Sequence, residues 1–289
     1  MIFSNIVKKE QIEKGWSGDK KYKVVTTDEK TYFLRITPKS KVSFCREIFD
    51  LQLRLCVLGI PMPKPYEIDE CSEGIYTIYQ YLDGVDAEDK IKSLPESEQY
   101  AYGKTAGEIL KVIHTVPAPD NAQNWESRFN AKINRKIKLY EDCPIKFKGA
   151  QFTIDYINAN RQLLKERPQC FQHGDYHVGN MMIEHDKLFV IDFDRLDYGD
   201  PWEEFNRIVW CAQASPKFAC GMVDGYFDGQ VPFLFWQLLA LYISSNTLSS
   251  IPWAIPFGQK EINVMINQAK EVLSWYDDMK NPIPTWYQP

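Results

Sequence analysis

Acidic, amide and imidazole side chains crowd the stretch FQHGDYHVGNMMIEHDKLFVIDFD, residues 171–194, which holds three of the chain's four histidines. Phosphoryl transfer needs a carboxylate beside the attacking hydroxyl and oxygen ligands for a magnesium ion that bridges the nucleotide phosphates. Asp175 can supply that carboxylate. Asn180, five residues later, and Asp192, at the end of an apolar strand-like run, offer the metal an amide and a carboxylate oxygen. The spacing therefore indicates a phosphate-and-magnesium site.

A metal-hydrolase interpretation of the same stretch stays open. His173, Asp175 and His177 alternate, so on an extended strand all three would project from one face, where they could bind zinc. A catalytic zinc site of this kind usually needs more histidine, and the chain offers only His185 and His114 besides. This alternative predicts stoichiometric zinc in the purified protein, whereas the phosphoryl-transfer interpretation predicts none.

The elements that must position these residues fall into two groups. Strand-forming runs at 22–27 and 31–37, joined by a polar turn at 28–30, precede a helix-like segment at 43–59 and a further strand at 74–84. From residue 96 onward the pattern is helical and is interrupted by short strands at 170–175 and 187–194. The expected helices are 97–116, 125–143, 152–168, 202–213, 218–227, 233–247 and 261–279. We therefore expect an N-terminal nucleotide-binding lobe at 1–84 and a C-terminal catalytic and acceptor-binding helical lobe at 85–289.

The motifs HGDYHVGN, VIDFD and YGDPWEEF resemble the signature of the aminoglycoside phosphotransferase and choline-kinase superfamily, and the bacterial aminoglycoside phosphotransferase branch most. The resemblance implies a two-lobed, protein-kinase-like α+β fold. Its small antiparallel β lobe would carry one helix, and its larger lobe would be mainly helical. It further implies that Asp175 is catalytic, that Asn180 and Asp192 bind Mg2+, and that His173 and Asp200 support the site.

The same resemblance places an ATP or GTP site in the N-terminal lobe. The glycine-containing turn before the strand run at 22–27 would present backbone N–H groups to a phosphate. Arg35 would hold phosphates while pairing with a helix acid, for which Glu47 is the candidate. The segment that joins the lobes would contact the purine. The predicted nucleotide-binding residues are Ser17, Gly18, Asp19, Arg35, Glu47, Gln80, Tyr81 and Leu82.

The acceptor is predicted to be a small cationic molecule, most simply an aminoglycoside, because the C-terminal lobe is rich in acids and aromatic residues. Its candidate ligands are Asp197, Glu203, Glu204 and Asp224. A metabolic kinase for choline, homoserine or another small hydroxyl compound is the first alternative. A nucleotide-binding, pseudokinase-type module without turnover is the second.

The bulk composition narrows the class of partner and the compartment. A formal net charge of -5 argues against a nucleic-acid binder, and no apolar run approaches the roughly 20 residues of a membrane span. Seven scattered cysteines without a CxxC pair fit reduced thiols. We expect a cytoplasmic protein that is a monomer or a weak homodimer and binds neither nucleic acid nor membrane.

Overall fold

The computed structural model describes residues 1–13 and 18–288, and its packing divides the chain into two units. Unit 1 combines Met1–Lys90 with Gly179–Leu196, and unit 2 combines Ile91–Val178 with Asp197–Pro289. The segment that carries Asn180 and Asp192 thus packs with the N-terminal part of the chain. The lobe boundary expected between residues 84 and 85 stays a prediction.

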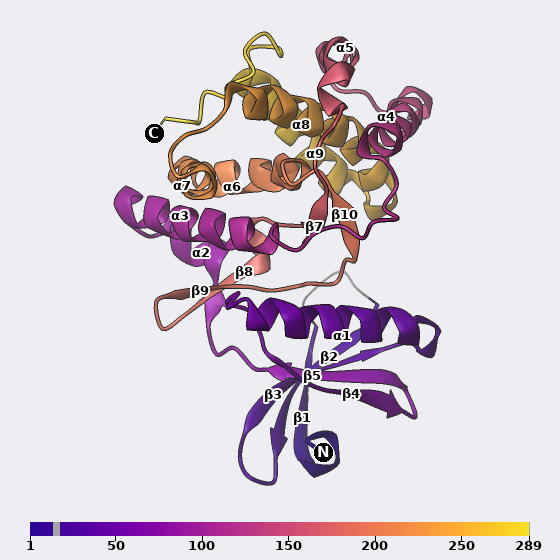
Figure 1. Ribbon diagram of the computed structural model, residues 1–289, viewed down its shortest axis with the longest axis vertical. Helices are drawn as coiled ribbons and strands as arrows, with labels where there is room; N and C mark the ends of the chain where they lie inside the picture. Colours follow the sequence, from indigo (N-terminus) through magenta and orange to yellow (C-terminus); the bar gives the residue numbers. More distant parts are fainter. Residues whose placement is uncertain (14–17, 289) are drawn as a thin grey trace. The chain divides into compact units, whose positions relative to one another are not determined.

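Unit 1 contains a five-stranded antiparallel sheet in the order β1-β2-β3-β5-β4, with the helix α1 lying along it (Figure 1). Apolar side chains of the three inner strands form the core of this sheet, among them Val24, Leu34 and Ile78. The bounds are β1 Ile6–Ile12, β2 Lys20–Thr26, β3 Thr31–Thr37, α1 Val42–Val57, β4 Pro65–Cys71 and β5 Gly74–Gln80.

The hairpin expected from the two N-terminal strand runs is confirmed. Strands β2 and β3 pair antiparallel, and the N–H of Thr26 donates to the carbonyl of Lys30 (3.0 Å) across the turn. The sequence did not predict β1, because its residues IVKKEQI are largely charged and exposed. Such a strand is tolerated at a sheet edge, where charged side chains also discourage pairing with another chain.

A second, three-stranded sheet in unit 1 has the order β6-β8-β9, with bounds Val85–Asp86, Met181–Glu184 and Lys187–Val190. His185 and Asp186 form the two-residue turn between β8 and β9, and both have left-handed φ values, 48° and 59°. That geometry matches the twist of a tight hairpin. His185 is therefore a turn residue, and the hairpin carries the chain from Asn180 to Asp192.

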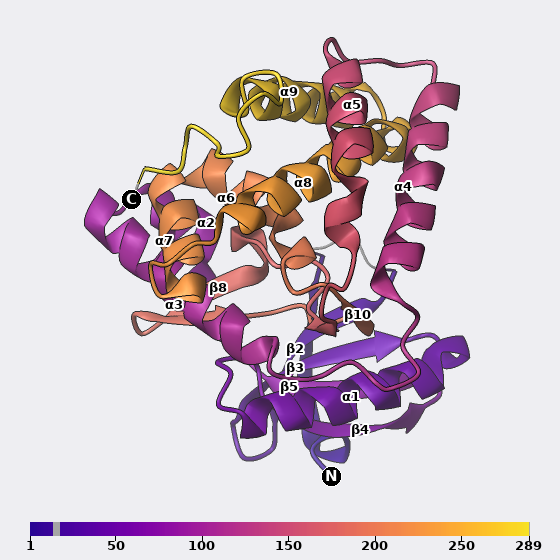
Figure 2. The ribbon, with the colours of Figure 1, turned by 45° about the horizontal axis from the view of Figure 1, so that its top comes forward.

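Unit 2 is mainly helical, and α8 is its central element (Figure 2). This helix is buried on nearly every side, and α4, α5 and α9 pack against it. A helix that is apolar all round belongs in a core; no helix among the described residues is long and apolar enough to cross a membrane. Helix α2, Ala87–Lys92, crosses from unit 1 into unit 2. The bounds within unit 2 are α3 Glu96–Ile113, α4 Trp125–Asp142, α5 Ala150–Asn160, β7 Cys170–Gln172, β10 Asp197–Gly199, α6 Ile208–Ala214, α7 Pro216–Phe227, α8 Phe233–Ala254 and α9 Gln259–Trp275.

Helices α3 and α7 approach each other so closely that glycine is required on both. A Cβ built on Gly107 would lie 2.1 Å from the carbonyl oxygen of Met222, and one on Gly221 would lie 2.1 Å from that of Tyr100. These obstacles are backbone atoms, which cannot rotate away. The pair matters for the site because the carbonyl of Ala106 on α3 accepts a hydrogen bond from Tyr176, the residue after Asp175 (2.7 Å).

We expect Gly107→Ala to lower the free energy of unfolding by about 1–3 kcal/mol, because the helices must separate to admit the methyl group. Urea unfolding of the variant and of wild type measures the loss. Glu108→Ala, at an exposed position of the same helix, is the matched control and should be nearly neutral. Equal stability of the two variants would refute the close packing of α3 on α7.

Candidate active site

Asp175 lies in unit 2, in the loop between β7 and the short 3-10 turn Val178–Asn180. Its carboxylate oxygen Oδ1 is 3.1 Å from Nε of Arg207 and 3.9 Å from Nε2 of His177. The side chain of Asp175 is 29% exposed. The carboxylate is thus held by a guanidinium on one side and remains accessible to a small molecule.

Three contacts fix the backbone of this loop. Nδ1 of His173, a fully buried side chain, accepts the N–H of Asp175 (3.3 Å), and the hydroxyl of Tyr176 donates to Ala106. The carboxylate of Glu204 accepts the N–H of Gly174 at 2.9 and 3.1 Å. Asp175 is therefore presented by a rigid loop, which is what the positioning of a reacting hydroxyl requires.

The alternating zinc arrangement expected for His173, Asp175 and His177 is not formed. Strand β7 ends at Gln172, and Gly174 has φ 82°, so the segment is not an extended strand with one shared face. Among the described residues, no group of three or more His, Cys, Asp or Glu side chains could hold a metal ion. The geometry thus argues against the metal-hydrolase alternative.

Glu204 is buried beneath the loop, and its pKa is raised to about 7. Burial is the main cause, and the negative charge of Glu203 adds to it. The N–H groups of Gly174, Tyr176 and His173 act in the opposite direction by stabilising the carboxylate. Glu204 therefore anchors the loop, although ionisation of its buried carboxyl near neutral pH destabilises the folded protein.

That pKa predicts a pH dependence of stability. Between pH 4.5 and about 7 the folded state keeps a proton on Glu204 that the unfolded state releases. The contribution of this group to the free energy of unfolding therefore falls as pH rises through that window. We expect Glu204→Gln to remove a decline on the order of 1–3 kcal/mol. Urea unfolding across the window checks this, with the exposed Glu141→Gln as control; curves parallel to wild type for both variants would contradict it.

Asp200 is fully buried on the other side of β7 and is surrounded by donors. Arg167 donates through Nε at 2.6 Å, the hydroxyl of Tyr242 lies at 2.6 Å, and the N–H of Trp202 at 2.9 Å. Trp202 also lies under the guanidinium of Arg167, 3.9 Å from ring centroid to Cζ. The Asp200 carboxylate thus ties the segment after β10 to α8.

The four acids expected to bind a cationic acceptor are each engaged within unit 2. Asp197 pairs with Arg128 and Glu203 with Lys132, whereas Glu204 binds the loop backbone. Asp224 accepts hydrogen bonds from the hydroxyls of Tyr100 and Tyr287, both at 2.7 Å. The acid-rich composition therefore does not produce a cluster of unpaired carboxylates from these four residues that could bind an ammonium group.

In unit 1, Arg35 joins two carboxylates at the end of the sheet. Its Nε donates to Asp19 (2.7 Å), and another guanidinium nitrogen contacts Asp194. Burial disfavours the charge, but the two carboxylates outweigh it and raise the pKa of Arg35. The expected pair of Arg35 with Glu47 is wrong: Glu47 is exposed on α1 and forms no ion pair among the described residues. Asp194 takes the carboxylate role because it reaches Arg35 from the segment after β9.

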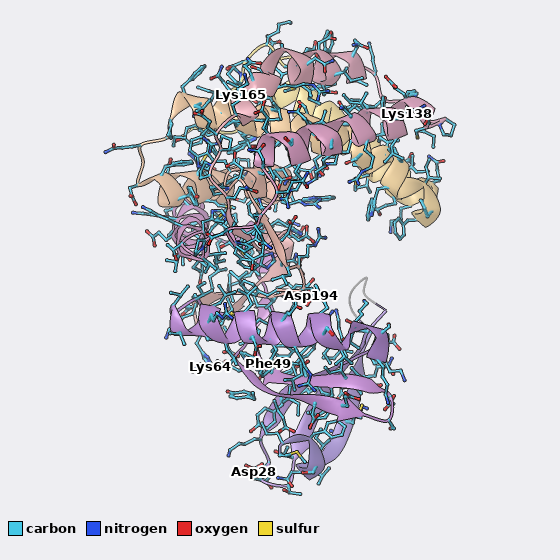
Figure 3. The ribbon with its side chains drawn as sticks, turned by 45° about the vertical axis from the view of Figure 1, so that its right-hand side comes forward. Asp28, Phe49, Lys64, Lys138, Lys165 and Asp194 are labelled. Atoms are coloured by element: carbon cyan, nitrogen blue, oxygen red, sulfur yellow. The ribbon has the colours of Figure 1, made fainter. Side chains whose placement is uncertain are left out.

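The pairing of Asp194 with Arg35 is one that the sequence analysis missed, although VIDFD places Asp194 only two residues after Asp192. Asp194 lies beside α1 (Figure 3), where Nε2 of Gln52 donates to the carbonyl of Phe193 (3.3 Å). Burial opposes its charge, yet the hydrogen bond and charge of Arg35 lower the pKa of Asp194.

The predicted magnesium ligands Asn180 and Asp192 belong to one local structure. The N–H of Ile191 donates to the carbonyl of Asn180 (3.0 Å), and Asp192 has a left-handed φ of 68°. The Asp192 side chain reaches solvent, but desolvation by the surrounding protein and the negative charge of Asp194 raise its pKa to about 7. An exposed carboxylate held in a turn against a like charge favours binding of a cation.

The remaining residues predicted to bind the nucleotide, where described, belong to unit 1. Gly18 precedes β2, whereas Ser17 lies outside the described residues. Gln80 ends β5, and its N–H donates to the carbonyl of Lys64 (2.8 Å). The ring of Tyr81 lies under the ammonium of Lys23, and Leu82 is buried. The purine contact expected from Gln80, Tyr81 and Leu82 stays a prediction.

Comparison with known structures supports the kinase-like fold. A choline/ethanolamine kinase family protein from Mesorhizobium loti is 14% identical with a TM-score of 0.67, over 95% of this chain and 91% of that chain. Aminoglycoside phosphotransferase APH(4)-Ia with AMP-PNP and hygromycin B is 16% identical with a TM-score of 0.69, over 94% and 95%. Spectinomycin phosphotransferase APH(9)-Ia with ADP and spectinomycin is 16% identical with a TM-score of 0.62, over 92% and 93%. The predicted two-lobed α+β fold is confirmed.

Sequence comparison gives the family. No curated protein matches the chain. The family model described as the phosphotransferase enzyme family matches residues 9–235, which is most of the sequence and includes Asp175, Asn180 and Asp192. The chain belongs to the phosphotransferase enzyme family.

Proposed function

We propose that the protein transfers the γ-phosphoryl group of ATP or GTP to a hydroxyl of a small molecule. The observation that carries the proposal is the Asp175 carboxylate, accessible and held on a loop whose backbone is fixed by His173, Tyr176 and Glu204. Asn180 follows five residues later, and the intervening chain spans at most about 18 Å. We propose that Asp175 and the two predicted metal ligands act on the same phosphoryl group.

The residues of the predicted magnesium site fit that ion. Mg2+ prefers oxygen ligands and keeps several waters, so the amide oxygen of Asn180 and the carboxylate of Asp192 suffice. The raised pKa of Asp192 reflects a carboxylate that a cation would stabilise. When bound, the ion would neutralise charge on the nucleotide phosphates.

The other residues position the reactants. Asp175 accepts a hydrogen bond from the acceptor hydroxyl and takes its proton late, because a loose transition state demands little of a base. Arg207 holds the Asp175 carboxylate in place. Arg35 offers the nucleotide phosphates the guanidinium donors that Asp19 and Asp194 do not use.

An aminoglycoside is the acceptor that the acid-rich helical lobe suggests, and known structures with this fold hold hygromycin B and spectinomycin. The engagement of Asp197, Glu203, Glu204 and Asp224 weakens that support. The alternative, a metabolic hydroxyl compound such as homoserine, does not depend on those acids. Both belong to the class of small-molecule kinases.

The test is an acceptor panel of aminoglycosides, macrolides and amino alcohols, each assayed with ATP and with GTP for nucleotide consumption. The Asp175→Asn variant is assayed with the same acceptor and nucleotide each time, and its nucleotide consumption is the background. We expect consumption that depends on an acceptor and on Asp175. Nucleotide binding without consumption across a broad panel would favour the pseudokinase alternative instead.

A further inference from the structure

Helix α4 presents a row of cations along one face. Arg128, Lys132 and Lys136 are spaced four residues apart, so their side chains lie above one another on the helix, and Arg135 lies beside them. The adjacent face packs on α8 through residues such as Phe129 and Ile133. The four-residue spacing is visible in the sequence, and the structure shows which side chains these cations contact.

Lys132 pairs directly with Glu203, and two further cations act on the same carboxylate at longer range. Nζ of Lys132 is 3.0 Å from Oε1 of Glu203, and the charges of Lys132, Lys136 and Arg207 together lower the pKa of Glu203 although burial opposes this. Glu203 is thus the one buried carboxylate on which these three charges act. Arg207 also contacts a second carboxylate, that of Asp175.

Lys136 is the member of this group that has no acid of its own. Its Nζ lies 3.5 Å from the amide oxygen of Asn246 on α8, and no carboxylate pairs with it among the described residues. Burial and the positive charges of Lys132, Arg207 and Arg135 lower the pKa of Lys136 to about 7, and the charge of Glu203 acts in the other direction. The positive charge around Lys136 therefore exceeds the negative charge that the protein supplies.

The group is also open to a ligand. The side chains of Lys132 and Arg207 are 34% and 26% exposed, comparable to that of Asp175. All of these residues belong to unit 2. Arg207 contacts the carboxylate of Asp175 directly, so a molecule bound by these cations lies next to the catalytic carboxylate.

We propose that Lys132, Lys136 and Arg207 bind an oxyanion group, a carboxylate or a phosphate monoester, carried by the acceptor whose hydroxyl contacts Asp175. This inference rests on the proposed function and names the acceptor class. A planar guanidinium and two ammonium groups are suited to oxyanions. A polycation at the same place would meet like charges, which is a means of rejecting it. The inference favours an anionic or zwitterionic hydroxy compound over an aminoglycoside.

Matched acceptors that differ only in the oxyanion test the proposal: D-glycerate and glycerol 3-phosphate against glycerol, and L-homoserine against L-homoserinol. We expect kcat/KM for the oxyanion member to exceed that of its partner without the oxyanion by about tenfold or more, the effect of one charge-assisted hydrogen bond. The carboxylate and phosphate members show which oxyanion is preferred. Lys136→Met should reduce that ratio towards one and leave KM for the nucleotide unchanged.

Lys138→Met is the control, because Lys138 is 69% exposed on α4, pairs with Asp142 and lies near the end of the helix (Figure 3). It should retain the full ratio. Three results would overturn the inference: turnover of glycerol equal to that of its anionic partners, turnover of kanamycin with an unchanged KM in Lys136→Met, or an effect of Lys136→Met on the nucleotide KM alone.

A binding measurement separates this inference from the proposed function. Inorganic phosphate is titrated calorimetrically into the nucleotide-free protein, and we expect about tenfold weaker binding to Lys136→Met than to wild type or Lys138→Met. Equal binding to all three proteins overturns the oxyanion site. Phosphate binding that depends on Lys136, without turnover of any acceptor, overturns the proposed function and leaves the oxyanion site standing.

Discussion

Asp175→Asn is expected to lower kcat by about 100- to 10,000-fold, the usual contribution of a positioned acid–base group. Asparagine keeps the size of the side chain and the N–H contact to His173. It removes the negative charge that holds Arg207 and that accepts the proton of the acceptor hydroxyl. Because Asp175 is not a predicted ligand of the metal or nucleotide, the Kd for the nucleotide should change by no more than about twofold, a small fraction of a kcal/mol.

Single-turnover kinetics and calorimetry measure the two quantities on the same preparation. Asp142→Asn is the matched control, since it removes an exposed acid that pairs with Lys138 elsewhere in unit 2. It should retain wild-type turnover. A kcat within a few-fold of wild type for Asp175→Asn would remove Asp175 from the catalytic role, whatever the behaviour of the control.

The second large effect is expected for Asp192→Ala, which should weaken binding of the magnesium–nucleotide complex at least about tenfold. The carboxylate is the only charged ligand proposed for the ion, and Asn180 alone is neutral. Removing it also relieves the repulsion with Asp194, so the folded protein should not lose stability. The defect should therefore appear in binding and not in unfolding.

Calorimetric titration of ATP with and without Mg2+ isolates the metal-dependent part of the affinity. In Asp192→Ala the two titrations should converge, whereas in wild type they should differ. Asp69→Ala, an exposed acid on β4, controls for the loss of one negative charge from unit 1. Magnesium-dependent affinity equal to wild type would remove Asp192 as a ligand.

The strongest local patterns were sufficient to predict much of the fold. The β2–β3 hairpin follows from two apolar runs around a polar turn, and α8 from a long apolar segment. Strand β1 escaped prediction because an edge strand with a charged surface has no apolar alternation to recognise. Strand β8 was obscured because its residues MMIE follow a motif whose polar residues suggest a loop.

The site was predictable in its residue types but not in its pairings. Asp175, Asn180 and Asp192 follow from spacing, yet nothing in the sequence states that Arg35 contacts Asp194 in place of Glu47. Which acid pairs with a given base depends on which distant segments of the chain lie side by side in the tertiary structure. The acids of unit 2 illustrate the same limit. The composition shows that Glu203 is an acid, but it does not show that Lys132 already pairs with it.

The most direct test of the central claim is whether an acceptor becomes phosphorylated. Each candidate acceptor is incubated with Mg-ATP or Mg-GTP and the protein, and its mass is then measured. The proposed function predicts that at least one acceptor gains a single phosphoryl group with wild type and not with Asp175→Asn. Nucleotide hydrolysis without any phosphorylated acceptor, or the same product with Asp175→Asn, would contradict it.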